Sequence, residues 1–158
     1  MDLEFRRAAA HQRIVRNAWV GSMAALLIYL LLPWFVSAPE STEGEPYRFF
    51  RVILWLVATT QVGVLFWWTR RLASKEAVMA AVRRTAIEPR TYFMGKKIAA
   101  IGMAHSVAVY GLVLAFIGRY FWDQYILTLI GAALLIRHYP HRHNFDELER
   151  EIDKKQKP

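Results

Sequence analysis

The stretch 98-IAAIGMAHSVAVYGLVLAFIG-118 contains no Asp, Glu, Lys or Arg over its 21 residues. An α-helix rises about 1.5 Å per residue, so this stretch spans roughly 30 Å as a helix, which matches the hydrocarbon core of a bilayer. Within that core a helix satisfies its own backbone polar groups. We therefore predict that residues 98–118 form a transmembrane helix.

Three further apolar stretches accompany it, at residues 18–36, 52–69 and 120–136. The first is long enough to cross a bilayer, and the second is at the lower limit of about 17 residues. The last has an uncharged run only from 124 to 136, so it spans the membrane only if residues 120–123 lie in the outer interface. The sequence thus predicts an all-α membrane protein with four transmembrane helices, forming a domain at residues 18–139.

Lys and Arg are concentrated in segments that would lie on one side of the membrane. Of the 21 Lys and Arg, 18 lie in residues 1–17, 70–97 and 137–158. Since loops rich in these residues stay in the cytoplasm, we expect both termini and the loop 70–97 to be cytoplasmic. A bacterial inner membrane is the expected location. The net charge of +8 then reflects topology, and no nucleic-acid partner is expected.

The segments outside the spans leave alternatives open. Residues 1–38 resemble a signal peptide with a small-residue ending, but the apolar run exceeds a typical h-region, so we expect it to be retained. The loop 70–97 either continues the second helix and turns near Pro89, or forms a docking surface for anionic lipid or an acidic partner. The tail 140–158 reads as a cytoplasmic amphipathic helix.

A row of small residues follows one side of the third span. Its members recur at intervals of four and three residues: Ala104, Ala108, Gly111, Ala115 and Gly118. Small side chains let two helix backbones approach closely, which is how membrane helices associate where no hydrophobic force acts between them. We call this row the small-residue seam and predict that it is a helix-packing surface.

His105 lies beside the seam, roughly 10 Å from the cytoplasmic end of the span. An ionisable residue at this depth raises a functional hypothesis. Either it is a neutral histidine, hydrogen-bonded across a helix pair to Thr59, Thr60, Gln61 or a backbone carbonyl, or it transfers protons, because its ordinary pKa lies near physiological pH.

The segment 102-GMAHSVAVYGLV-113 resembles the second helix of the rotor-ring proteolipid of rotary ATP synthases. In that family an acidic residue is commonly followed, five and six positions on, by Tyr-Gly, and here His105 stands in its place before Tyr110 and Gly111. The family's ion-binding carboxylate is therefore missing, and the preceding span carries only Gly63 where the family has repeated glycines. The same segment also resembles small multi-span bacterial membrane proteins.

The remaining chemistry-bearing residues predict no active site. His138, His141 and His143 follow the fourth span and are weak metal candidates, because their spacing matches no recognised site and Arg137 and Arg142 would repel a cation. The chain has no cysteine, which excludes thiolate chemistry. We find no catalytic triad and no phosphate-binding loop, and we expect no cofactor and no enzymatic activity.

Two functions remain, from different classes. The first is a non-catalytic integral membrane subunit or assembly factor of a larger complex, which packs through the small-residue seam against other integral membrane subunits or a second copy, among membrane lipids. The second is a small transporter or proton-conducting element that uses His105.

Overall fold

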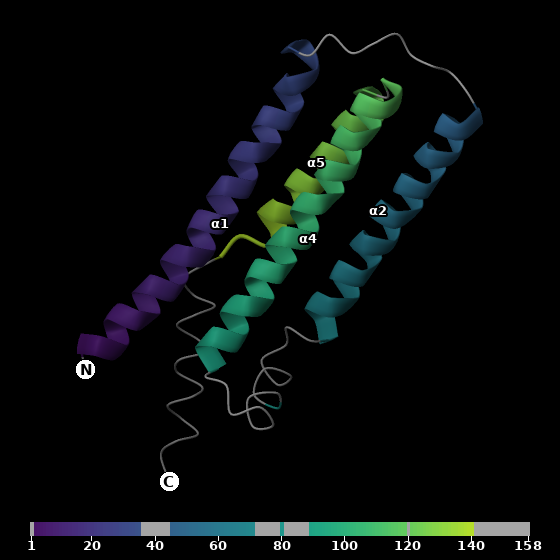
Figure 1. Ribbon diagram of the computed structural model, residues 1–158. Coiled ribbons are helices and arrows are strands. Elements are labelled where there is room, and N and C mark those ends of the chain that lie inside the picture. Colours follow the sequence, from purple (N-terminus) through teal and green to yellow (C-terminus); the bar gives the residue numbers. More distant parts are fainter. Residues whose placement is uncertain (1, 36–44, 72–79, 81–88, 120, 141–158) are drawn as a thin grey trace.

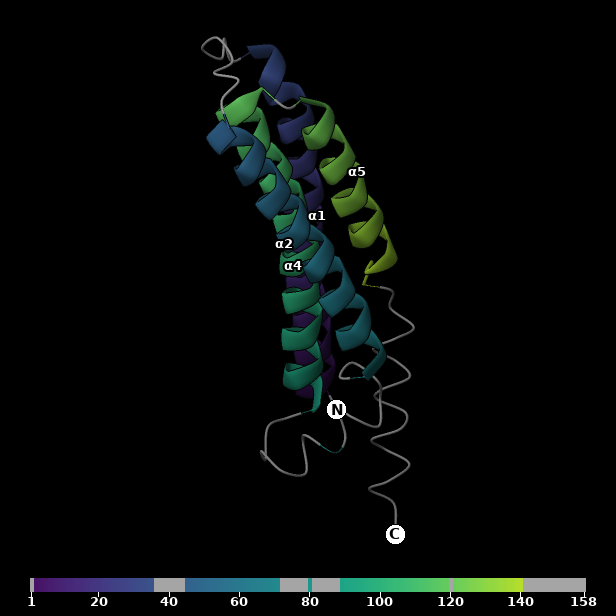
Figure 2. The ribbon, with the colours of Figure 1, turned by 90° about the vertical axis from the view of Figure 1, so that its right-hand side faces the viewer.

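A computed structural model describes residues 2–35, 45–71, 80, 89–119 and 121–140 of the chain. Over these residues the fold consists of four long α-helices and contains no strand: α1 (Asp2–Phe35), α2 (Glu45–Arg71), α4 (Pro89–Gly118) and α5 (Phe121–Arg137). The helices lie lengthwise beside one another and alternate in direction (Figures 1 and 2). The end where α1 and α4 begin, and where α2 and α5 end, is called the N-terminal end below. The predicted all-α class is confirmed.

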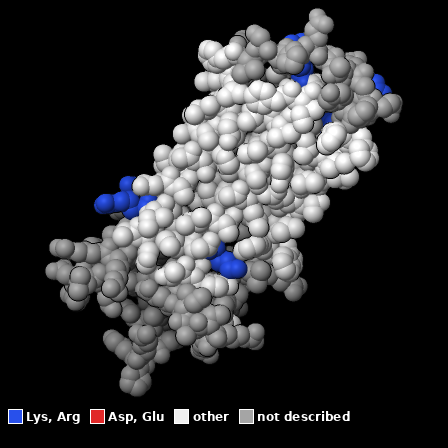
Figure 3. Space-filling model, in the orientation of Figure 1, with Lys and Arg blue, Asp and Glu red and all other residues white. Residues whose placement is uncertain are grey.

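Three of these helices are long and apolar enough to cross a membrane, through Ala10–Leu32, Arg48–Arg70 and Thr91–Gly118. The face seen in Figure 3 agrees, because its described Lys and Arg gather toward the two ends and leave an uncharged band between them. The protein is therefore a helical membrane protein. Helix α5 has 17 residues and is roughly 26 Å long, slightly shorter than a typical hydrocarbon core, so a fourth span stays a prediction.

Two helix boundaries follow from local chemistry. Helix α4 begins at Pro89, where the sequence predicts a break, because proline has no N–H to donate and its fixed φ suits the first helical position. Arg119, between α4 and α5, has a φ of 54°, in the left-handed region. This conformation ends α4 and reverses the direction of the chain before α5. The residues predicted to form a cytoplasmic loop and an amphipathic tail lie mostly outside the described residues.

Helix α4 occupies the centre of the bundle and packs against the other three helices. Helices α1 and α2 lie on opposite sides of the α4–α5 pair (Figures 1 and 2), and α1 also packs against α5. The buried core is rich in small and aliphatic side chains from α4 and α5, such as Ala104, Val107 and Leu135. By contrast, Ala58 and Leu65 are the only buried apolar residues among the described side chains of α2.

Candidate functional site

The small-residue seam of α4 faces α5 of the same chain. Ala104 and Ala108 are fully buried, and a side chain at Gly111 would meet the Cα of Gln124 and the Cβ of Leu127, each 3.0 Å from its Cβ position. From the other side, a Cβ added at Gly131 would lie 3.1 Å from the carbonyl oxygen of Ala104.

The last two residues of the seam, toward the C-terminal end of α4, are also withdrawn from the surface. Ala115 is 4 % exposed and Gly118 is half-buried. The seam thus packs within the chain, and a partner protein would have to use another surface.

His105 contacts helix α1 instead of α2. Its Nε2 lies 3.2 Å from the hydroxyl oxygen of Tyr29, and the two rings are 5.5 Å apart. Of the expected partners, Thr59, Thr60 and Gln61 of α2 do not make this contact. The backbone-carbonyl alternative has a counterpart in Ser22 of α1, whose backbone is hydrogen-bonded to His105. The reason is geometric: α1 packs on α4 beside the seam, at the angle where His105 projects.

Helix α5 adds two fully buried polar residues to this region. Gln124 donates a hydrogen bond from its side-chain nitrogen to the backbone carbonyl of Tyr29, and Thr128 lies one helical turn further along α5. The Oε1 of Gln124 and the Oγ1 of Thr128 have no hydrogen-bond partner among the described residues. We call Tyr29, His105, Gln124 and Thr128, which come from α1, α4 and α5, the polar column.

Gln61 joins α2 to α4 through a separate hydrogen-bond network. Its amide nitrogen donates to the carbonyl of Met103, at 3.0 Å, and to the hydroxyl of Ser106. Its amide oxygen accepts from the hydroxyl of Tyr110 at 2.7 Å. Polar side chains that bond across helices in this way are a common means of association in membranes.

An ion pair joins α2 to α5 at the end opposite the N-terminal end. Arg51 donates two hydrogen bonds to Asp123, from Nε at 2.6 Å and from Nη2 at 3.0 Å, in the paired geometry that guanidinium and carboxylate favour. The Asp123 side chain is 5 % exposed, whereas that of Arg51 is 48 % exposed. This contact brings together two residues that are 72 positions apart.

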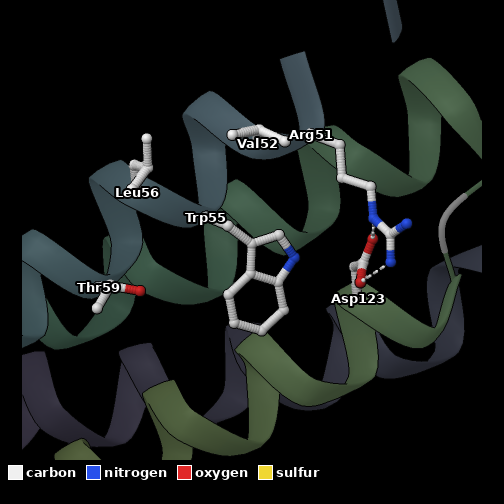
Figure 4. Close-up of a pocket in the computed structure, with 6 residues that line it drawn as sticks. All are labelled: Arg51, Val52, Trp55, Leu56, Thr59 and Asp123. Atoms are coloured by element: carbon white, nitrogen blue, oxygen red, sulfur yellow. Dashed lines mark hydrogen bonds and ion pairs between the residues drawn. The ribbon is translucent and has the colours of Figure 1, made fainter. Parts of the chain in front are cut away.

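A groove of about 430 Å³ begins at this ion pair. Its lining comes from α2 and the first turn of α5: Arg51, Val52, Trp55, Leu56, Thr59 and Asp123. Figure 4 shows the indole of Trp55 directed from α2 toward α5, with the ion pair closing one end of the space. We call this space the α2–α5 groove.

The histidines near the end of α5 were weak candidates for a metal site. His138 is buried, and its pKa is lowered, first by burial and then by the positive charges of Lys97 and Arg137. His141 and His143 lie outside the described residues. Among the described residues, no three His, Asp or Glu side chains gather in a way that could hold a metal ion.

Sequence reasoning missed Tyr29, Gln124, Thr128 and the pairing of Arg51 with Asp123. Asp123 did carry a signal, because a lone carboxylate beside an apolar run needs a partner if it is buried. Gln124 and Thr128 also stood four residues apart, on one face of a short apolar helix.

Comparisons with models of protein families, with curated proteins and with solved structures give no match. Arguments about function therefore rest on the geometry described above.

Proposed function

We propose that this chain is a non-catalytic integral membrane subunit or assembly factor of a larger membrane complex. The observation that carries the proposal is the outward face of α2. In the middle of its span, Thr59, Thr60 and Gly63 are all exposed, and nothing lies within 4 Å of the Cβ position of Gly63. Small and hydroxyl-bearing residues at this depth are typical of a surface that another helix covers.

The spacing of these residues supports a helix as the covering partner. Thr59 and Gly63 are four residues apart and lie on one face of α2, in the small-xxx-small pattern that permits close approach. Thr59 also lines the α2–α5 groove, so the exposed face continues into a concave surface. Because α5 covers the seam of α4, we assign the partner contact to this face of α2.

A photoreactive residue at position 63, in cells that express the full chain, tests this surface. We expect a specific protein adduct from position 63 and none from position 20, where Val20 is exposed on α1. Gly63→Leu should abolish partner co-purification and leave thermal unfolding unchanged, whereas Val64→Leu should preserve both. Lipid adducts alone, at equal yield from both positions, would refute the proposal.

The proposed topology places both termini in the cytoplasm, with α5 as a fourth span, in a bacterial inner membrane. It is supported by the distribution of 18 of 21 Lys and Arg on one side. Cysteines introduced at Glu43 and Lys155 should react differently with an impermeant thiol reagent added to intact cells, with labelling only at position 43. Labelling at both positions would rule this topology out.

The polar column favours a second candidate function, a small proton-conducting element that uses His105. Its support is the contact of Tyr29 with His105, next to two buried polar residues of α5 whose hydrogen-bonding capacity is not filled among the described residues. Buried polar groups without partners are rare, and water molecules often satisfy them. The resemblance to the rotor-ring proteolipid supports this candidate in one respect: His105 stands where that family has its ion-binding acidic residue.

Liposomes with an imposed pH gradient separate the two functions. A proton flux in the wild type that disappears in His105→Gln would support conduction, because glutamine does not titrate near neutral pH. Absence of flux in both proteins would leave the subunit proposal standing.

A further inference from the structure

A group of cations gathers at the N-terminal end of the bundle, where α4 begins and α2 and α5 end. Its members are Lys96 and Lys97 of α4 and Arg137 of α5, and we call them the basic rim. Lys97 is half-buried rather than fully solvated. Lys97 and Arg137 both lower the pKa of His138, after the larger effect of burial, so both act on the same residue at the end of α5.

Aromatic rings hold these cations in place. The ammonium of Lys96 lies 4.4 Å from the ring centre of Trp68 and 5.1 Å from that of Tyr92. The guanidinium of Arg137 lies 5.0 Å from the ring centre of Phe66, which is on α2. Since Trp68 also belongs to α2, cations from two different helices are oriented around the end of the same third helix.

The basic rim has no acidic counterpart among the described residues. No carboxylate there forms an ion pair with any of its three cations, and Asp123, which pairs with Arg51, lies at the other end of α5. Like charges repel one another, so an anion near these cations would be favoured.

We propose that the basic rim binds the phosphate headgroup of an anionic phospholipid. Phosphate oxygens would accept from Lys96, Lys97 and Arg137, of which Lys96 and Arg137 are oriented by aromatic rings of α2. A lipid is favoured over a free anion because α2 continues from this site as an exposed apolar surface, with Phe66 38 % and Val64 41 % exposed. Acyl chains would cover that surface, and basic sites between membrane helices commonly bind acidic lipids in this way.

This inference does not depend on the proposed partner, since the headgroup site lies around Phe66 and Trp68 at the end of α2, whereas the partner surface, Thr59 to Gly63, lies in the middle of its span. The test uses the full chain in mild detergent, with native mass spectrometry after addition of phosphatidylglycerol or phosphatidylcholine. We expect phosphatidylglycerol to bind at least tenfold more tightly than phosphatidylcholine. Raising the salt concentration should reduce this preference, since the contact is electrostatic.

Matched variants locate the site. Lys96→Gln combined with Arg137→Gln should remove the preference for phosphatidylglycerol. Lys96→Arg combined with Arg137→Lys keeps both charges and should retain most of that preference. Arg48→Gln, an exposed cation at the opposite end, should leave it unchanged. Helix content by circular dichroism confirms that each variant is folded, and the single variant Lys96→Gln, which should lose part of the preference, replaces the double Gln variant if that one does not fold.

Three outcomes would overturn the proposal. Equal binding of the two lipids would mean that the basic rim is neutralised by other means. An equal loss of preference in Arg48→Gln would place the site elsewhere. Complete competition by millimolar inorganic phosphate would show a site for a free anion instead of a lipid.

Discussion

The α4–α5 hairpin and helix α2 are held in the bundle by different physical means. In the hairpin two backbones touch, because Gly111 and Gly131 leave room for the facing helix. Helix α2 buries little apolar surface and is attached by discrete side-chain contacts, from Gln61 and Arg51. Close packing of small residues thus creates a fixed pair, whereas individual polar bonds attach a helix that can be loosened one contact at a time.

The largest expected effect comes from breaking the hairpin. Gly111→Leu would drive a side chain into the Cα of Gln124, which is backbone and cannot turn aside. We expect a loss of about 1 to 3 kcal/mol or more, in line with overpacking of a tight core. Unfolding by a denaturing detergent measures this loss of stability. Gly102→Leu is the control, since nothing lies within 4 Å of that Cβ position on the same helix. Equal losses in the two variants would show that the hairpin is not tightly packed.

A smaller loss is expected when the ion pair of α2 is broken. Arg51→Ala leaves Asp123 buried without that partner, and because Arg51 is itself half exposed we expect about 1 to 2 kcal/mol, less than for a fully buried pair. Arg48→Ala, one turn earlier and exposed, should change stability little. The same detergent titration compares them. A loss in Arg48→Ala as large as that in Arg51→Ala would mean that general surface charge matters more than the pair.

The Gln61 network should contribute about 1 kcal/mol. Gln61→Leu keeps the size of the side chain and removes its bonds to Met103, Ser106 and Tyr110, and interhelical hydrogen bonds in membranes have modest values. The measurement is the yield of a cysteine cross-link between α2 and α4, which should fall. Thr60→Val, on the exposed side of α2, serves as the control. An unchanged yield in Gln61→Leu would leave apolar packing as the main attachment of α2.

The smallest effect is expected at His105, which joins α4 to α1. His105→Gln keeps a donor and an acceptor for the Tyr29 hydroxyl and should cost less than about 0.5 kcal/mol, whereas His105→Leu should cost on the order of 1 kcal/mol. Stability in detergent at neutral pH separates the two. If glutamine costs as much as leucine, the imidazole ring has a specific role that hydrogen bonding alone does not explain.

Local patterns were sufficient for the all-helical class and marked the row of small residues on α4, but they did not indicate which helix would face that row. An apolar run and a spacing of three and four residues are properties of one segment, and they survive whatever that segment packs against. The pairing of Arg51 with Asp123 and of Tyr29 with His105 depends on which helices are neighbours and on their relative height. The lipid-facing and helix-facing surfaces of transmembrane helices are similarly apolar. The composition of the helices therefore did not reveal that α1, and not α2, lies beside His105.

The reversal of the chain at Arg119 has a consequence for biosynthesis. Helix α5 follows α1, α2 and α4 in the chain and carries Asp123 in its first turn, with Gln124 and Thr128 further along. If α5 crosses the membrane as proposed, Arg51 and the carbonyl of Tyr29 would already have been synthesised when its polar residues enter. The turn at Arg119 would then place α5 beside α4, so that these polar residues would meet protein instead of lipid.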